Sequence, residues 1–77
     1  MIDNISINSL RYFVKVAETR NITAAAAELF LTQPTLSRKI AKLEEDVGKK
    51  LLIRNTKGIE LTQDGIAFYE QSKRIIA

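Results

Sequence analysis

Apolar residues recur along much of this chain at the three- and four-residue spacing of amphipathic helices. Residues 7–19 carry apolar side chains at i, i+3, i+4 and i+7, which predicts a helix with one buried face. These positions are Leu10, Phe13, Val14 and Ala17. Ser6 stands directly before this segment and is a residue type that caps helix N-termini.

A second, shorter helix is predicted to begin after Thr23 as its N-cap and to end near Phe30. The alanines at 24–27 are strong helix formers, and their small side chains allow a neighbouring helix to approach closely. Leu29 and Phe30 are the apolar side chains that we expect this helix to bury.

A third helix is predicted from Thr32 to Gly48, with Pro34 tolerated in its first turn and Gly48 as a left-handed terminator. Its apolar stripe consists of Leu36, Ile40, Leu43 and Val47. At about 100° per residue, Arg38 points away from this stripe, with Pro34, Thr35 and Lys42 in the same exposed arc. The second and third helices therefore read as a pair joined by a tight turn.

The last third of the chain predicts a hairpin followed by a fourth helix. Residues 52–54 and 59–61 are short strand-forming pieces, and turn formers occupy residues 55–58 between them. Thr62 can cap a helix that runs to the last residue. The chain stops inside this helix without a terminator, as expected for a sequence cut from something longer.

Composition limits the chemistry that is available to this chain. At 77 residues one domain is expected, and 45% hydrophobic with 27% charged residues is ordinary for a globular protein. The absence of Cys and His excludes thiol and imidazole catalysis, disulfides and the usual zinc ligands. No apolar run approaches the roughly 18 residues of a membrane span, and the first residues do not resemble a signal peptide.

Positive charge is concentrated in the middle of the chain. Residues 32–58 contain seven bases and three acids, for a net +4, whereas the rest contains five bases and six acids, for a net −1. A surface that faces phosphates has this distribution, although an ordinary solvated face has it too. The acids Glu44, Glu45 and Asp46 crowd the end of the third helix, either because that end stays outside a DNA groove or for solubility alone.

The start of the third helix carries side chains suited to reading DNA. Arg38 can pair with guanine O6 and N7, and Gln33 can pair with adenine N6 and N7. Ser37 adds a third donor, and Pro34 and Thr35 offer apolar contact to a thymine methyl group. The helix N-terminus itself favours a phosphate.

Two further segments are candidates for contacts. Arg54 and Lys57 on the hairpin would reach phosphates or the minor groove, unless they are only ordinary surface charges. Lys49 and Lys50 read equally as backbone contacts or as charges at a helix end.

The fourth helix carries an apolar stripe that a small core leaves over. Its members are Phe68, Tyr69, Ser72, Ile75 and Ile76. We expect a helix–helix dimer to cover them, with packing on the first helix of the same chain as the alternative. Ile66, on another side, is expected to cover the domain's own core.

Six blocks in order resemble the N-terminal domain of LysR-type transcriptional regulators. They are LRYF at 10–13, NITAAAAEL at 21–29, TQPTLSRKI at 32–40, LEEDVG at 43–48, LLIR at 51–54 and LTQDG at 61–65. The resemblance implies a mainly α, winged helix-turn-helix fold with a three-helix core, a two-stranded wing and a fourth linker helix. It also implies a cytoplasmic regulator of promoter DNA that dimerises through the fourth helix and forms tetramers when full-length. A small-molecule effector would bind a C-terminal sensor domain that is absent from this chain.

This resemblance divides the chain into residues 5–62, the DNA-binding domain with its helix-turn-helix at about 22–41, and residues 63–77, the start of the dimerisation helix. Thr32 matches a position suited to a phosphate contact, and Thr35 and Leu52 stand where the family commonly has Ala and Phe. The expected DNA contacts are Thr32, Gln33, Pro34, Thr35, Ser37, Arg38, Lys42, Arg54 and Lys57.

Two other classes of function compete with DNA binding. A winged-helix module for protein interaction would carry an apolar or acidic face where the third helix is basic. An enzyme is disfavoured because there is no phosphate loop of the GxxxxGK kind, and because the adjacent carboxylates at 44–46 splay around their helix. Neither a cofactor nor a metal ion is expected.

Overall fold

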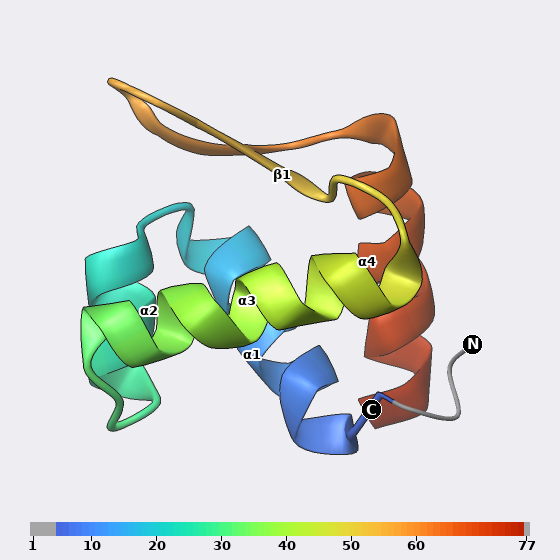
Figure 1. Ribbon diagram of the computed structural model, residues 1–77, viewed down its shortest axis with the longest axis horizontal. Coiled ribbons are helices and arrows are strands. Elements are labelled where there is room, and N and C mark those ends of the chain that lie inside the picture. Colours follow the sequence, from blue (N-terminus) through green and yellow to red (C-terminus); the bar gives the residue numbers. More distant parts are fainter. Residues whose placement is uncertain (1–4, 77) are drawn as a thin grey trace.

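The computed structural model describes residues 5–76, which fold into four helices and one two-stranded antiparallel sheet (Figure 1). The elements are α1 (Ile7–Thr19), α2 (Ile22–Glu28), α3 (Gln33–Val47), β1 (Leu52–Asn55), β2 (Gly58–Leu61) and α4 (Gln63–Ile76). The mainly α fold with a two-stranded wing is thus confirmed.

Helix α1 is the centre of the fold, because it packs against α2, α3 and α4. Its predicted stripe is confirmed as buried, and Val16 is fully buried as well. A helix with neighbours on three sides buries a wider arc than one stripe, so periodicity alone did not predict Val16. Ser6 caps α1 as expected, with its Oγ accepting from the Ser9 N–H at 3.1 Å.

Helix α2 differs from its prediction at both ends. Its N-cap is Asn21 rather than Thr23, with the Asn21 Oδ1 accepting from the Ala24 N–H at 2.9 Å. Both residue types cap helices, and starting at Asn21 directs Ala25 and Ala26 into the core.

The expectation that Phe30 is buried is wrong. Phe30 is 95% exposed and has a left-handed backbone, with φ of 59°. Its N–H donates to the Ala27 carbonyl at 3.2 Å and the Leu31 N–H donates to the Ala26 carbonyl at 2.9 Å. This is the Schellman arrangement, which turns the side chain after the C-cap outward and brings the next one, Leu31, against the core.

Helix α3 has the predicted caps. The Thr32 Oγ1 accepts from the Thr35 N–H at 3.3 Å, and Gly48 ends the helix with φ of 80°. Near its end, the Glu44 Oε2 accepts from the N–H groups of Leu51 and Leu52 at 2.8 and 3.0 Å. Glu44 therefore fastens the start of the wing to α3. The two explanations of the acidic residues 44–46, exclusion from a DNA groove and solubility, did not include this role.

The wing pairs Leu52 with Leu61 and Asn55 with Gly58, so its turn lies where the sequence placed it. Leu52 is only 3% exposed, which means that the smaller side chain still seats the wing on the core. Gly58 has φ of 126°, and a Cβ there would lie 2.9 Å from the Arg20 carbonyl oxygen. A glycine is therefore required where the wing passes the end of α1.

Helix α4 packs on α1 of the same chain, which corrects the expectation of a leftover stripe. The rings of Phe68 and Phe13 meet edge to face at 5.3 Å, and Ser72 is only 1% exposed. Tyr69 is half-buried, with its hydroxyl donating to the Glu18 Oε2 at 3.1 Å, and Ile76 packs partly on the core. Phe68 and Ser72 therefore face inward, and Ile75 is the most exposed of the five predicted dimer residues, at 49%.

The expectation that Ile66 covers the core of the domain is also wrong, because this residue is half exposed. Within residues 5–76, no helix combines the length and the apolar character that crossing a membrane requires.

Candidate nucleic-acid interface

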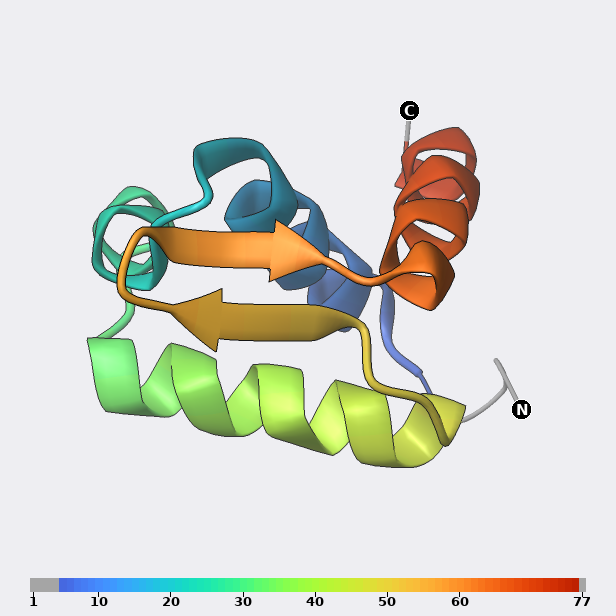
Figure 2. The same cartoon turned by 90° about the horizontal axis from the view of Figure 1, so that it is seen from above.

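Helix α3 runs across the front of the molecule in Figure 1, and the wing lies beside it when seen from above (Figure 2). Leu36, Ile40 and Leu43 fix its inner face in the core. Arg38 is exposed on the opposite face, as predicted from the helical spacing. The hairpin turn and the first turn of α3 lie at the same end of the molecule, so the wing extends the surface formed by α3 (Figure 2).

One chain of hydrogen bonds orders the exposed face of α3. The Thr32 Oγ1 donates to the Thr35 Oγ1 at 2.9 Å, and the Arg38 Nη2 donates to the same oxygen at 3.3 Å. Because a guanidinium has five N–H donors, this contact orients Arg38 and leaves further donors for a ligand. Thr35 therefore acts through its hydroxyl on the residue most suited to read a base.

A second chain of hydrogen bonds joins the wing to α3. The Gln33 Nε2 donates to the Ser37 Oγ at 2.9 Å, and the Arg54 Nη2 donates to the same oxygen at 3.3 Å. Arg54 lies on β1, seventeen residues after Ser37 in the chain. The structure thus brings the predicted wing arginine together with two predicted residues of α3.

The bases of residues 32–58 fall into two groups. Three of them pair with carboxylates: Lys42 with Asp46 at 2.8 Å and Glu45 at 3.9 Å, Lys49 with Asp64 at 3.5 Å, and Lys50 with Glu44 at 3.9 Å. No such ion pair within residues 5–76 involves the other four, which are Arg38, Lys39, Arg54 and Lys57. The unpaired positive charge of residues 32–58 therefore lies on α3 and the wing.

Two predicted residues are less closely tied to this surface. The hydrogen bond from Lys42 to Asp46 raises the pKa of the Lys42 ammonium and holds it toward the end of α3. Lys57 is exposed in the hairpin turn, where its N–H donates to the Asn55 Oδ1 at 2.9 Å. The pairing of Lys49 and Lys50 with carboxylates favours their reading as charges at the helix end.

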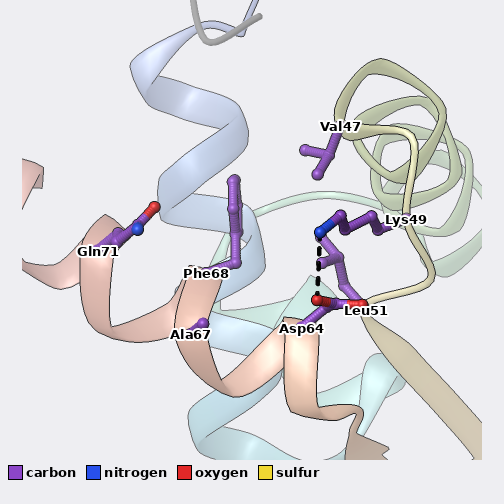
Figure 3. Close-up of a pocket in the computed structure, with 7 residues that line it drawn as sticks. All are labelled: Val47, Lys49, Leu51, Asp64, Ala67, Phe68 and Gln71. Atoms are coloured by element: carbon purple, nitrogen blue, oxygen red, sulfur yellow. Dashed lines mark hydrogen bonds and ion pairs between the residues drawn. The ribbon is translucent and has the colours of Figure 1, made fainter.

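An apolar hollow of about 220 Å³ lies away from this surface, between the end of α3, the start of the wing and α4 (Figure 3). Phe68 and Leu51 line it, and the Lys49–Asp64 ion pair spans its edge. The residues that the structure describes contain no cluster of His, Cys, Asp or Glu that could hold a metal ion.

Residues 7–66 match the family described as "Bacterial regulatory helix-turn-helix protein, lysR family". The transcriptional regulator BudR of Klebsiella aerogenes is 49% identical over 73 residues, which is 95% of this chain. The chain spans about half the length of that protein (51%) and about a quarter (25%) of BudR from Raoultella terrigena.

Solved structures match over nearly the whole chain. The crystal structure of a CbnR_DBD–DNA complex superposes with a TM-score of 0.90 at 44% identity, covering 94% of this chain and 83% of that one. The complex of BenM_DBD with catB site 1 DNA also gives a TM-score of 0.90, at 39% identity, with coverage of 94% and 81%.

Proposed function

Because the chain belongs to the lysR family of bacterial regulatory helix-turn-helix proteins, we propose that it binds double-stranded promoter DNA in a sequence-specific manner. Helix α3 enters the major groove, and the wing lies on the flanking backbone or the minor groove. The observation that carries this proposal is the surface of α3 and the wing, where ordered donors lie beside Arg38, Lys39 and Arg54, three bases that form no ion pair within the described residues. The similar CbnR and BenM domains, crystallised with DNA, support it.

Each residue of the surface has a proposed part. Gln33, Ser37 and Arg38 read base edges, and Pro34 and Thr35 contact a thymine methyl group. The remaining predicted residues bind phosphates, and these are Thr32, Lys42, Arg54 and Lys57. Among the latter, Lys42 would have to leave Asp46 before it could bind a phosphate.

At the level of organisation, residues 5–62 form the DNA-binding unit and residues 63–77 begin a dimerisation helix. Two copies joined through α4 would present two α3 helices to an inverted repeat. The full-length protein would act in the cytoplasm, with a sensor domain outside this sequence binding the effector. The family consists of regulators, not enzymes. We propose no catalytic activity, cofactor or metal ion for this chain.

Selection of bound duplexes from a random library, at two salt concentrations, tests the proposal directly. We expect an inverted repeat with half-sites a whole number of helical turns apart. Binding that enriches no sequence and disappears in salt would contradict sequence-specific recognition and would favour a protein-interaction module with a basic surface.

We expect Arg38→Ala to weaken binding to the selected duplex by about 1–3 kcal/mol and to relax preference at one base pair. The reason is that Arg38 is held by Thr35 on the face of α3 away from the core. Repeating the selection with this variant measures both effects, and Arg11→Ala on α1 controls for the loss of an exposed arginine. Equal weakening on all sequences would show that Arg38 contacts only phosphate.

A further inference from the structure

A basic hollow of about 360 Å³ separates the start of α1 from α3. We call it the α1–α3 hollow, and its lining residues are Ser9, Thr35, Arg38, Lys39 and Lys42. Ser9 and Lys39 were not among the residues that the sequence pattern selected. The hollow lies on the side of α3 that faces α1, whereas the wing lies on the other side.

The two sides of α3 follow from successive residues. Side chains one residue apart point about 100° away from each other, so Ser37 and Lys39 flank Arg38 on opposite sides. Ser37 accepts the hydrogen bond from Arg54 of the wing. The Lys39 Nζ lies 5.6 Å from the centre of the Tyr12 ring on α1. Each side of the α3 face that bears Arg38 therefore carries one base, Arg54 or Lys39, without a carboxylate partner in residues 5–76.

A helix in the major groove has one sugar–phosphate backbone on each side, because the groove is about 12 Å wide and the helix nearly fills it. The wing lies on the side of one of these backbones. We propose that the α1–α3 hollow binds a phosphodiester of the other backbone, with Lys39 as the principal contact. This inference rests on the proposed function, since it assumes that α3 lies in the groove.

The chemistry of the hollow fits a phosphodiester. Lys39 and Arg38 supply positive charge, and the Ser9 hydroxyl, within hydrogen-bonding distance of Ser6 at 3.1 Å, supplies a neutral donor. Asp46 and Glu45 hold the Lys42 ammonium at the end of the hollow away from Lys39. The phosphate therefore binds at the end near Lys39, where the nearby carboxylates repel it least.

The test compares Lys39 with an exposed arginine on α1. Lys39→Gln removes the proposed contact, and Arg11→Gln removes an exposed positive charge on α1, outside the proposed DNA and dimer surfaces. The dissociation constant is measured for the selected duplex and for a scrambled duplex over a series of salt concentrations. Thermal melts of both variants confirm that the fold is intact.

We expect Lys39→Gln to weaken binding to both duplexes by a similar factor, roughly fivefold, and to reduce the log–log salt slope by about 0.9. Lys39→Arg should retain the slope, and Arg11→Gln should leave affinity and slope unchanged. An unchanged slope for Lys39→Gln would overturn the phosphate site while sequence-specific binding by the parent chain stands. Weakening on the selected duplex alone would also overturn it, because Lys39 would then read a base. A parent chain that binds no duplex would refute the proposed function itself.

Discussion

At the scale of single residues, Gly65 decides how closely α4 approaches the wing. A Cβ on Gly65 would lie 2.1 Å from the Leu51 carbonyl oxygen, which accepts from the Thr62 N–H at 3.0 Å. The Thr62 Oγ1 in turn donates to the Lys50 carbonyl at 2.7 Å and accepts from the Gly65 N–H at 2.9 Å. The added Cβ would meet backbone atoms of Leu51, and Thr62 hydrogen-bonds to the backbone of both Leu51 and Gly65. Neither segment can therefore move aside without breaking these hydrogen bonds.

We therefore expect Gly65→Ala to lower the free energy of unfolding by about 3 kcal/mol, although alanine favours helices in general. Urea denaturation followed by circular dichroism measures the change. Gly48→Ala is the matched control, because Gly48 has φ of 80° but no atom within 4 Å of an added Cβ. That variant should lose only about 1 kcal/mol, from backbone strain. Equal losses for both would mean that the close approach to Leu51 carries no cost.

Phe30 shows why some residues were misread from the sequence. The pattern identifies it as apolar and close to a buried helix, which is correct, but its direction depends on the left-handed turn that ends α2. Glycine or asparagine usually marks such a turn, and neither occurs at this point in the chain. The sequence therefore gave no sign that the backbone turns at Phe30 and directs its side chain to solvent.

At the scale of elements, the sequence predicted each helix and both strands to within a residue or two, because periodicity, caps and turn formers are local signals. It could not predict the links between elements. The bonds from Glu44 to the wing and from Arg54 to Ser37 join residues that are seven to seventeen positions apart. The face of α3 that bears Arg38 was thus predictable, whereas its flanks, with Arg54 on one side and Lys39 on the other, depend on how the wing and α1 pack.

The link made by Glu44 gives a prediction for the α3–wing junction. We expect Glu44→Ala to lower the free energy of unfolding by about 3 kcal/mol, because two wing N–H groups lose a charged acceptor. The Glu44 side chain is only 15% exposed. Glu45→Ala serves as the control, since its side chain is 78% exposed and makes only a 3.9 Å ion pair.

Chemical denaturation of both variants should separate them by more than 2 kcal/mol, roughly the difference between two charged hydrogen bonds and one surface ion pair. Indistinguishable midpoints would refute the view that Glu44 fastens the wing to α3. The acidic run would then serve solubility alone.

At the scale of the whole molecule, the fourth helix belongs to the core on one side and remains open on the others. Periodicity placed Phe68 and Ser72 on one face of α4, but it did not predict that α1 covers that face or that Ile75, assigned to the same stripe, is exposed. Phe68 meets Phe13 in the core, so a charge at Phe68 would unfold the chain and would not report on association. The large apolar side chains of α4 that remain exposed are Ile66 and Ile75, each about half exposed (51% and 49%).

This distribution changes the test of the proposed dimer. We expect the 77-residue chain to sediment as a reversible dimer, and Ile75→Asp to shift it toward monomer by at least tenfold in dissociation constant, equivalent to about 1.4 kcal/mol. A buried charge at a helix–helix contact has a cost of this order or larger. Ile53→Asp on the wing is the control, because Ile53 is 47% exposed and lies on β1, away from α4.

Sedimentation equilibrium at several concentrations, with circular dichroism to confirm the fold, distinguishes the outcomes. A dimer that is lost only in Ile75→Asp supports association through α4 near its C-terminal end. A dimer that survives Ile75→Asp but dissociates in Ile66→Asp would place the contact on the other flank of the same helix. A parent chain that is monomeric throughout would contradict dimerisation through residues 63–77, because the exposed isoleucines of α4 would then be insufficient to hold two copies together.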